Sequence, residues 1–219
     1  MDTSTESSGF QVTQLTAINV AKIVTIMCLT TLALIYGIKE ERQVIYLCLH
    51  IGYCLWWLLE QWLFPERRQQ IFTEKVGILT LIFFVLFVGV FYSLPGYLVF
   101  INPNPASYGT IAIALFLYIF GSLINTGADV QKTTAKKVKG GLVKDGIWRS
   151  VRHINYLGDL MRYTSFSVIT GDWRAFVLPG IVALLYIQRI GQKEQAMSDK
   201  YPEFSSYQKN SSRLLPWIW

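Results

Sequence analysis

Two long stretches without a single charged residue constrain this chain more than any other feature. They run from Val76 to Ile101 and from Pro103 to Ala128. At about 1.5 Å per residue, a helix of either length crosses a hydrocarbon core of roughly 30 Å. Inside such a core every backbone polar group needs an internal partner, which a helix provides. The sequence therefore predicts membrane-spanning helices.

Four further apolar stretches complete a predicted set of six spans. They are Leu15–Ile38, Val44–Phe64, Ile154–Thr170 and Trp173–Ile190. The chain is 52% hydrophobic and its mean hydropathy is +0.35, which exceeds the apolar share of ordinary soluble domains. We predict an all-α fold, a polytopic integral membrane bundle of about six transmembrane helices.

The distribution of basic residues predicts the orientation of these spans. With the N-terminus in the cytoplasm, the inner segments hold fifteen Lys and Arg residues and the outer segments hold three. Basic loops remain on the cytoplasmic side, so both termini and the loop between the fourth and fifth spans are predicted to lie there. The same rule explains the net charge of +6. Nucleic acid is therefore not expected as a partner, whereas anionic lipid headgroups or an anionic cofactor are.

Three regions are expected along the chain. Residues 1–14 are rich in Ser and Thr and lack the basic segment of a cleavable signal peptide, so we expect a short disordered tail. N-terminal transmembrane helices are expected over residues 15–120, and a C-terminal cofactor-binding region over 121–219. The cysteines Cys28, Cys48 and Cys54 lie in apolar helices, where cysteine behaves as a small hydrophobe. Neither a disulfide nor a metal site is expected.

A dense polar segment, residues 129–159, separates two of the apolar spans. It carries seven of the twenty Lys and Arg residues and one of the two histidines. At its end, Asp159 and the following Arg162 enter a span at i, i+3 spacing, where charges are costly unless they pair or face a polar cavity. A structural ion pair and a wet pocket open to the cytoplasm are the two interpretations. The other polar residues of the segment favour the pocket.

The cations at the ends of this segment suit an anionic ligand. Lys132 and Lys136 follow the fourth span, and Arg149 and Arg152 precede the fifth. Together they match a ligand that carries phosphates, although each one alone is more simply a solvated charge. The Gly140-Gly141 pair lacks the strand and spacing of a nucleotide fingerprint. A nucleotide would therefore bind here without a Rossmann fold.

Two motifs in this region carry a family resemblance. Leu142-Val-Lys-Asp-Gly-Ile-Trp148 and Arg152-His-Ile-Asn-Tyr-Leu-Gly-Asp159 resemble the C-terminal signature of sterol reductases and steroid 5-alpha-reductase-like proteins. The flanking segments 128–132 and 200–217 also resemble that family, so the likeness extends from about Gly121 to Trp219. The wider family of isoprenylcysteine carboxyl methyltransferases shares the Arg-His-x-x-Tyr-x-Gly core.

The resemblance implies a helical membrane enzyme that binds NADPH without a Rossmann fold. The positions that match the family's cofactor pocket are Gln131, Lys132, Lys136, Trp148, Arg152, His153, Asn155, Tyr156, Gly158, Asp159, Arg189 and Glu194. Two departures count against NADPH: Gln192-Lys193 replaces an Arg-Asp pair, and Ala135 replaces an aromatic residue. Asn155 and Asp159, in contrast, agree with the reductases rather than with the methyltransferases.

The leading hypothesis is an NADPH-dependent reduction of a C=C bond in a lipophilic, steroid-like or isoprenoid, substrate. Such a reaction needs a proton donor. Glu60 is a candidate, because burial among the tryptophans of residues 56–62 would keep its carboxyl group protonated. An interfacial glutamate at a helix end is the simpler interpretation of Glu60. Tyr163, one turn from Asp159, is the other candidate.

Two alternatives remain open from the sequence. The first is S-adenosylmethionine-dependent methyl transfer to a prenylated or other lipid substrate, with the Arg152-His153 and Tyr156-x-Gly158 core around the cofactor. The second is a non-catalytic lipid-binding membrane protein that keeps the same fold. A lipophilic small molecule and membrane lipids are the expected partners in each case. Nothing in the sequence predicts an oligomeric state.

Overall fold

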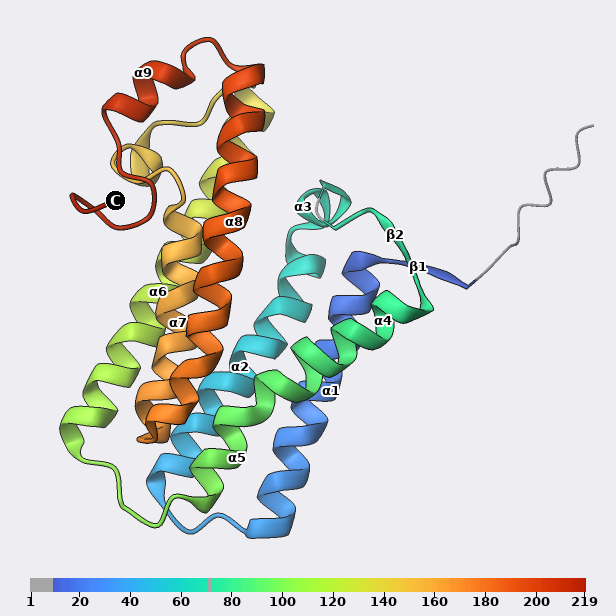
Figure 1. Ribbon diagram of the computed structural model, residues 1–219, viewed down its shortest axis with the longest axis vertical. Helices are drawn as coiled ribbons and strands as arrows, with labels where there is room; N and C mark the ends of the chain where they lie inside the picture. The colour runs from blue at the N-terminus through green and yellow to red at the C-terminus, as the bar shows by residue number, and fades with distance from the viewer. Residues whose placement is uncertain (1–9, 71) are drawn as a thin grey trace, which may run out of the picture. The chain divides into compact units, whose positions relative to one another are not determined.

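The chain folds into two compact helical units. The computed structural model describes residues 10–70 and 72–219, and the units divide between Ile101 and Asn102. The predicted boundary after residue 120 differs, because it falls inside α6 (Tyr108–Val138), which lies wholly in the second unit (Figure 1). The units divide at the polar turn that begins at Asn102. Residue 120, in contrast, lies within a continuous helix.

The first unit contains three long helical segments and a small antiparallel sheet. Its elements are β1 (Gln11–Thr13), α1 (Gln14–Tyr36), α2 (Glu41–Leu63), α3 (Pro65–Gln70), β2 (Lys75–Gly77), α4 (Ile78–Phe84), η1 (Val85–Val90), η2 (Phe91–Ser93) and α5 (Leu94–Ile101). Val12 pairs with Val76 across the sheet. The last residues of the expected N-terminal tail therefore form a strand, and residues 1–9 lie outside the described part of the chain.

The third segment of this unit is an uninterrupted helix from α4 to α5 that widens at η1. The wider turn of η1 is π-helical, and such turns leave carbonyl groups without their usual helical donors. The hydroxyl of Thr25 on α1 lies 3.0 Å from the carbonyl oxygen of Val88, and that of Ser93 donates to Gly89 at 3.0 Å. Side-chain donors thus stabilise this stretch of the helix before Pro95, which has no N–H to contribute.

The second unit holds the polar segment found in the sequence. Its elements are α6, η3 (Gly146–Trp148), α7 (Ile154–Thr170), η4 (Trp173–Phe176), α8 (Val177–Lys200) and α9 (Phe204–Lys209). The backbones of α6 and α7 approach each other closely at Gly121 and Gly158. A Cβ atom added to Gly121 would lie 2.6 Å from the carbonyl oxygen of Gly158. Beside this crossing, Asn125 Nδ2 donates to the carbonyl oxygen of Asn155 at 2.8 Å.

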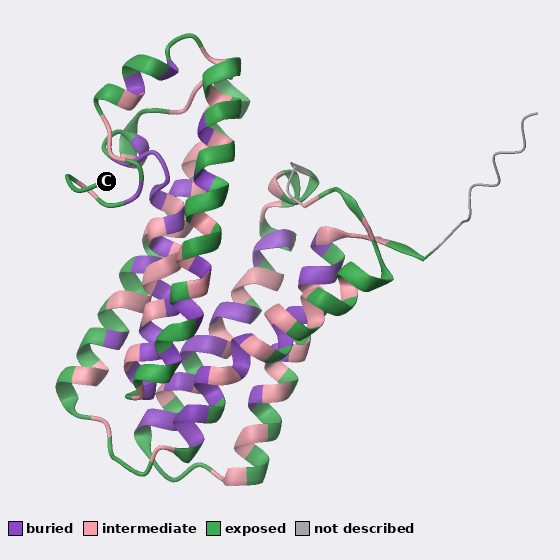
Figure 2. Cartoon of the chain, viewed as in Figure 1, coloured by how far each residue is buried: buried purple, intermediate pink, exposed green. Residues whose placement is uncertain are grey.

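Five helical segments of the described chain are long and apolar enough to cross a membrane. They are Gln14–Tyr36, Glu41–Leu63, Ile78–Ile101, Tyr108–Val138 and Trp173–Lys200. The predicted sixth, α7, has 17 residues and is not among these five. Many of its positions are buried (Figure 2). The charged Arg162 is among them. The chain is thus an all-α integral membrane protein, as predicted, while the side on which its termini lie stays a prediction.

Candidate functional site

The polar segment after α6 folds back as a loop that Gln131 fixes. The Gln131 side chain donates from Nε2 to the carbonyl oxygen of Asp145, and its Oε1 accepts from the Ile147 amide, both at 3.1 Å. Gly146 between them has a φ of +61°, and a Cβ atom there would lie 2.0 Å from Gln131 Nε2. Gln131, a predicted cofactor ligand, therefore holds the turn at Gly146.

Trp148 supports the same loop from inside. Its indole N–H donates to the carbonyl oxygen of Ala128 at 3.1 Å, and the side chain is buried with Val151. The ammonium group of Lys132 lies 5.0 Å from the centroid of the Trp148 ring, a cation–π distance. Trp148 thus joins the loop to α6 and positions Lys132, in addition to any contact with a ligand.

A buried carboxylate, Glu194 of α8, joins the loop to the C-terminal segment. Its Oε1 accepts from Arg152 Nε at 2.8 Å, and its Oε2 accepts from Arg213 Nε at 3.1 Å. His153 Nε2 lies 3.4 Å from Oε1. The side chains of Arg152 and Glu194 are only 5% and 6% exposed. A carboxylate buried this deeply is stable only with such partners.

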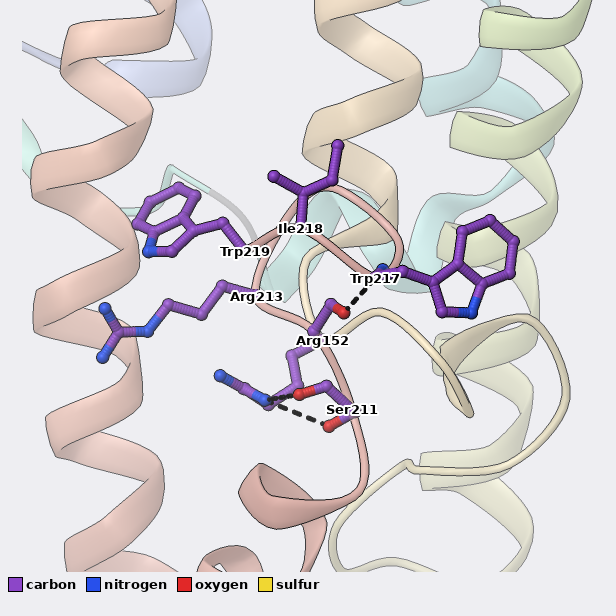
Figure 3. Close-up of a pocket in the computed structure, with 7 residues that line it drawn as sticks. Arg152, Ser211, Arg213, Trp217, Ile218 and Trp219 are labelled. Carbon is purple, nitrogen blue, oxygen red and sulfur yellow. Dashed lines mark hydrogen bonds between the residues drawn. The ribbon is translucent and has the colours of Figure 1, made fainter.

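Arg152 also binds the backbone of the C-terminal segment. Its Nη1 donates to the carbonyl oxygen of Gln208 at 3.1 Å and to both oxygen atoms of Ser211 (Figure 3). The Arg152 amide donates to the carbonyl oxygen of Ser212 at 2.9 Å, so the two segments pair. These contacts give Arg152 and Glu194 a structural role. Their predicted contact with a cofactor stays a prediction.

Tyr156 lies in a stack of rings at the start of α7. Its ring centroid is 4.3 Å from that of Tyr186 and 5.8 Å from that of His153, with nearly parallel planes. Its hydroxyl group is buried, and no hydrogen-bond partner for it exists among the described residues. A buried hydroxyl without a partner is unfavourable. Tyr156 is therefore well suited to bind a ligand.

Asp159 lies beside this stack and is held by two neighbours. It accepts hydrogen bonds from the hydroxyl of Tyr186 and from the guanidinium group of Arg162. The ion pair that was one interpretation of Asp159 and Arg162 is thus present. Tyr186 joins it to the aromatic stack, so this pair also orients the rings beside the candidate site.

Four cations from α6 and α8 lie close enough for their charges to interact, and one of them, Lys193, lies beside Tyr156. The charge of Lys193 interacts with those of Lys132, Lys136 and Arg189, and with the single carboxylate of Asp129. We call these five residues the cationic cluster. The ammonium group of Lys193 lies 4.8 Å from the Tyr156 ring centroid. With four positive charges against one negative charge, the cluster favours an anionic ligand.

Sequence reasoning did not assign Asp129 to the site, and on α8 it missed Tyr186 and Lys193. Lys193 had counted against NADPH, because it lies where the resembling family has an acidic residue. Tyr186, Arg189 and Lys193 are spaced by three and four positions, which places them on one face of α8. That spacing is the signal that could have identified them.

The two predicted catalytic residues have different surroundings. Glu60 belongs to the first unit, where its Oε1 lies 2.6 Å from Arg67 Nη1. This contact does not test the assignment of Glu60 as a proton donor, which stays a prediction. Tyr163 is buried in the second unit, with its ring 6.1 Å from that of Phe166. Its role as a proton donor stays a prediction.

The environment of His153 predicts a pH-dependent stability. Burial lowers the pKa of His153, although the negative charge of the nearby Glu194 carboxylate acts in the opposite direction. The unfolded chain then binds more protons than the folded chain below about pH 6.5, so stability is complete above that value and falls as the pH drops. We expect the Tm in detergent to fall from about pH 7 to about pH 5, and the His153→Gln variant to show a smaller fall. Identical pH profiles for the two proteins would contradict this account.

Comparison with known proteins agrees with the resemblance in the site region. The chain is 27% identical over 184 residues to the Delta(14)-sterol reductase of Arabidopsis thaliana, which covers 75% of this chain and 49% of that protein. It is 29% identical over 150 residues to the Delta(14)-sterol reductase TM7SF2 of Mus musculus, which covers 58% of this chain and 35% of that protein. The chain thus spans half or less of the length of these relatives. Residues 7–211 match one family throughout, and the chain belongs to that family, described as "Protein of unknown function (DUF1295)".

Proposed function

We propose that this chain is a membrane reductase that uses NADPH to reduce a C=C bond of a lipophilic, sterol-like substrate. The cationic cluster beside Tyr156 is the observation that carries the proposal. The names of the two Delta(14)-sterol reductases support the reaction class. The positive-inside distribution of charge supports a cytoplasmic position for this site.

The charge of the cluster distinguishes the two cofactors. NADPH carries a diphosphate and a further phosphate, each of which suits fixed Lys and Arg side chains. S-adenosylmethionine has no phosphate and carries a positive sulfonium group, which four nearby cations would repel. In our proposal the replacement of the family's acidic residue by Lys193 therefore does not abolish cofactor binding. Lys193 adds a fourth cation for the phosphates instead.

Each residue of the site has a separate task in this proposal. Lys132, Lys136, Arg189 and Lys193 bind the phosphates, and the Tyr156 hydroxyl donates a hydrogen bond to the cofactor. When bound, NADPH supplies the hydride. The second carbon of the double bond takes a proton from an acidic group, for which Tyr163 and Glu60 stay the predicted candidates. Asp159 and Arg162 hold Tyr186, and through it the orientation of Tyr156.

Ligand-dependent thermal stability tests the proposal. Purified full-length protein in detergent should be stabilised by NADPH, by about 2.7 kcal/mol at a concentration of 100 times its Kd. We expect the variant Lys193→Gln to bind NADPH about tenfold more weakly, because one charged contact with a phosphate is lost. Lys209→Gln removes the same charge from an exposed site on α9 and should leave the affinity unchanged.

The two alternatives predict other results in the same experiment. Stabilisation by S-adenosylmethionine without any from NADPH would replace the reductase by a methyltransferase. Stabilisation by neither compound, together with binding of a sterol, would support a non-catalytic lipid-binding protein. Equal NADPH affinities of the Lys193→Gln and Lys209→Gln variants would show that the cationic cluster does not bind the cofactor.

A further inference from the structure

The C-terminal loop, residues 214–219, presents large apolar side chains to its surroundings. Trp217 is 96% exposed and Ile218 is 81% exposed. The φ of Trp217 is +61°, in the left-handed region that bulky residues rarely adopt. Neighbouring apolar side chains with this exposure are unfavourable in water and mark a surface that another phase or molecule covers.

Internal hydrogen bonds fix the shape of this loop. The amides of Leu214 and Leu215 donate to the carbonyl oxygen of Trp219 at 2.8 and 2.9 Å, and the Trp217 amide donates to Ser212 Oγ at 3.1 Å. Ile218 lies between the indole rings of Trp217 and Trp219, which point in opposite directions (Figure 3). A pocket of about 330 Å³ opens between the loop, residues 211–213 and Arg152. The apolar side chains are thus displayed by a structured element.

Leu214 determines the depth of the loop along the helices. It is buried in a cluster with Ile190 and Tyr156. An uncharged stretch runs from Ala175 at the end of η4 to Gln188 of α8, and Arg189 is the first charge beyond it. The part of α8 that faces hydrocarbon therefore ends close to Ile190, and the loop lies at the same level. Tryptophan is enriched at this depth, where its ring contacts both lipid and water.

A cation accompanies the exposed aromatic residues. Arg213 binds Glu194 through Nε, yet its side chain is 47% exposed. Its guanidinium carbon lies 5.7 Å from the ring centroid of Trp219. An exposed guanidinium beside apolar side chains matches an anionic headgroup above acyl chains.

We propose that residues 214–219 insert into the interfacial layer of the membrane, with Trp217 and Ile218 among the acyl chains and Arg213 at an anionic lipid headgroup. The loop then acts as a lipid-dependent anchor. Because residues 211–213 pair with the backbone before α7, the anchor holds the C-terminal segment beside His153 and Tyr156. This inference does not depend on the cofactor of the site.

A dye that reports polarity tests the insertion. The full-length chain, with its three native cysteines replaced by alanine, receives a thiol-reactive fluorophore at Ile218→Cys and is reconstituted in lipid nanodiscs. The matched control carries the dye at Ser206→Cys, an exposed position on α9. We expect blue-shifted emission and loss of iodide quenching at position 218 but not at position 206. Iodide quenching of equal strength at both positions would overturn the proposal.

Lipid composition tests the headgroup contact. Nanodiscs that contain phosphatidylglycerol should increase the blue shift at position 218 relative to pure phosphatidylcholine, and Arg213→Gln should abolish the increase. Inorganic phosphate added to phosphatidylcholine nanodiscs should not reproduce it. Equal spectra in the two lipids, or an equal effect of free phosphate, would refute the anionic headgroup as the ligand of Arg213.

Discussion

The Arg152→Ala variant is expected to lower the free energy of unfolding by about 3–5 kcal/mol, because it leaves the buried carboxylate of Glu194 without its closest partner. The substitution also removes the guanidinium contacts with Gln208 and Ser211. For a chain of this size such a loss corresponds to a fall in Tm of roughly 10 °C in a detergent melting experiment.

Two further variants separate the causes of this loss. Arg149→Ala removes the same charge from an exposed position on the same loop and should change stability by less than about 0.5 kcal/mol. Arg152→Lys keeps the charge but loses the planar donors that reach Glu194 and Ser211 together, so we expect an intermediate Tm. If Arg152→Ala melted at the same temperature as Arg149→Ala, Arg152 would not support the loop as we describe.

The membrane-spanning part of the fold could be predicted from the sequence, because a bilayer imposes one requirement. A helix that crosses it needs a long apolar stretch, and Val76–Ile101 satisfies that requirement without reference to any other segment. α7 is less predictable because it lacks such a long apolar stretch. Its seventeen residues carry Arg162 on a buried face, and whether a charge is tolerated there depends on neighbours that the local sequence does not specify.

The candidate site shows a sharper limit. The density of polar residues in the sequence was enough to predict where the candidate site lies. It was not enough to predict the role of each side chain. Gln131 and Trp148 form hydrogen bonds with the carbonyl groups of Asp145 and Ala128, and those contacts exist only once the loop has folded back onto α6. The same residue types bind cofactors in other proteins. Type and spacing alone therefore cannot separate a ligand from a support.

Glu60 is a second example of a residue whose contacts the local sequence does not specify. An apolar neighbourhood suggested a protonated carboxyl group, and the contact with Arg67 was not foreseen. Helix α2 ends at Leu63 and α3 begins at Pro65. Arg67, seven positions after Glu60, thereby reaches the Glu60 carboxylate. Charge compensation of this kind depends on where a helix ends, which is among the least certain features of a sequence-based prediction.

The cationic cluster depends on how closely its helices approach one another. Lys132 comes from α6 and Lys193 from α8, and both lie against rings, those of Trp148 and Tyr156 respectively. Tyr156 is on α7, whose separation from α6 is limited at Gly121 and Gly158. A change in that separation would displace the ring that Lys193 contacts. The crossing of α6 and α7 is therefore a determinant of the site as well as of the fold.

The Gly121→Ala variant tests this crossing. Its new Cβ atom would lie 2.6 Å from the carbonyl oxygen of Gly158 and 2.8 Å from Met161 Cβ. Because the nearest atom belongs to backbone, the clash can be relieved only if α6 and α7 move apart, which strains the hydrogen bond between Asn125 and Asn155. We expect a loss of about 3 kcal/mol, at the upper end for overpacked interiors, visible as a lower Tm, together with weaker NADPH-dependent stabilisation.

Gly127→Ala is the matched control for this substitution, since it changes the same residue type on the same helix. A Cβ atom at Gly127 would have no neighbour within 4 Å, and the position is exposed. Alanine has the higher helix propensity, so this variant should be unchanged or up to about 1 kcal/mol more stable. Gly158→Ala should resemble Gly121→Ala, because its Cβ would lie 2.7 Å from the Asn125 amide nitrogen and from the carbonyl oxygen of Gly121. Equal melting temperatures for Gly121→Ala and Gly127→Ala would show that the close approach of α6 and α7 does not limit stability, and the link between this crossing and the site would then be wrong.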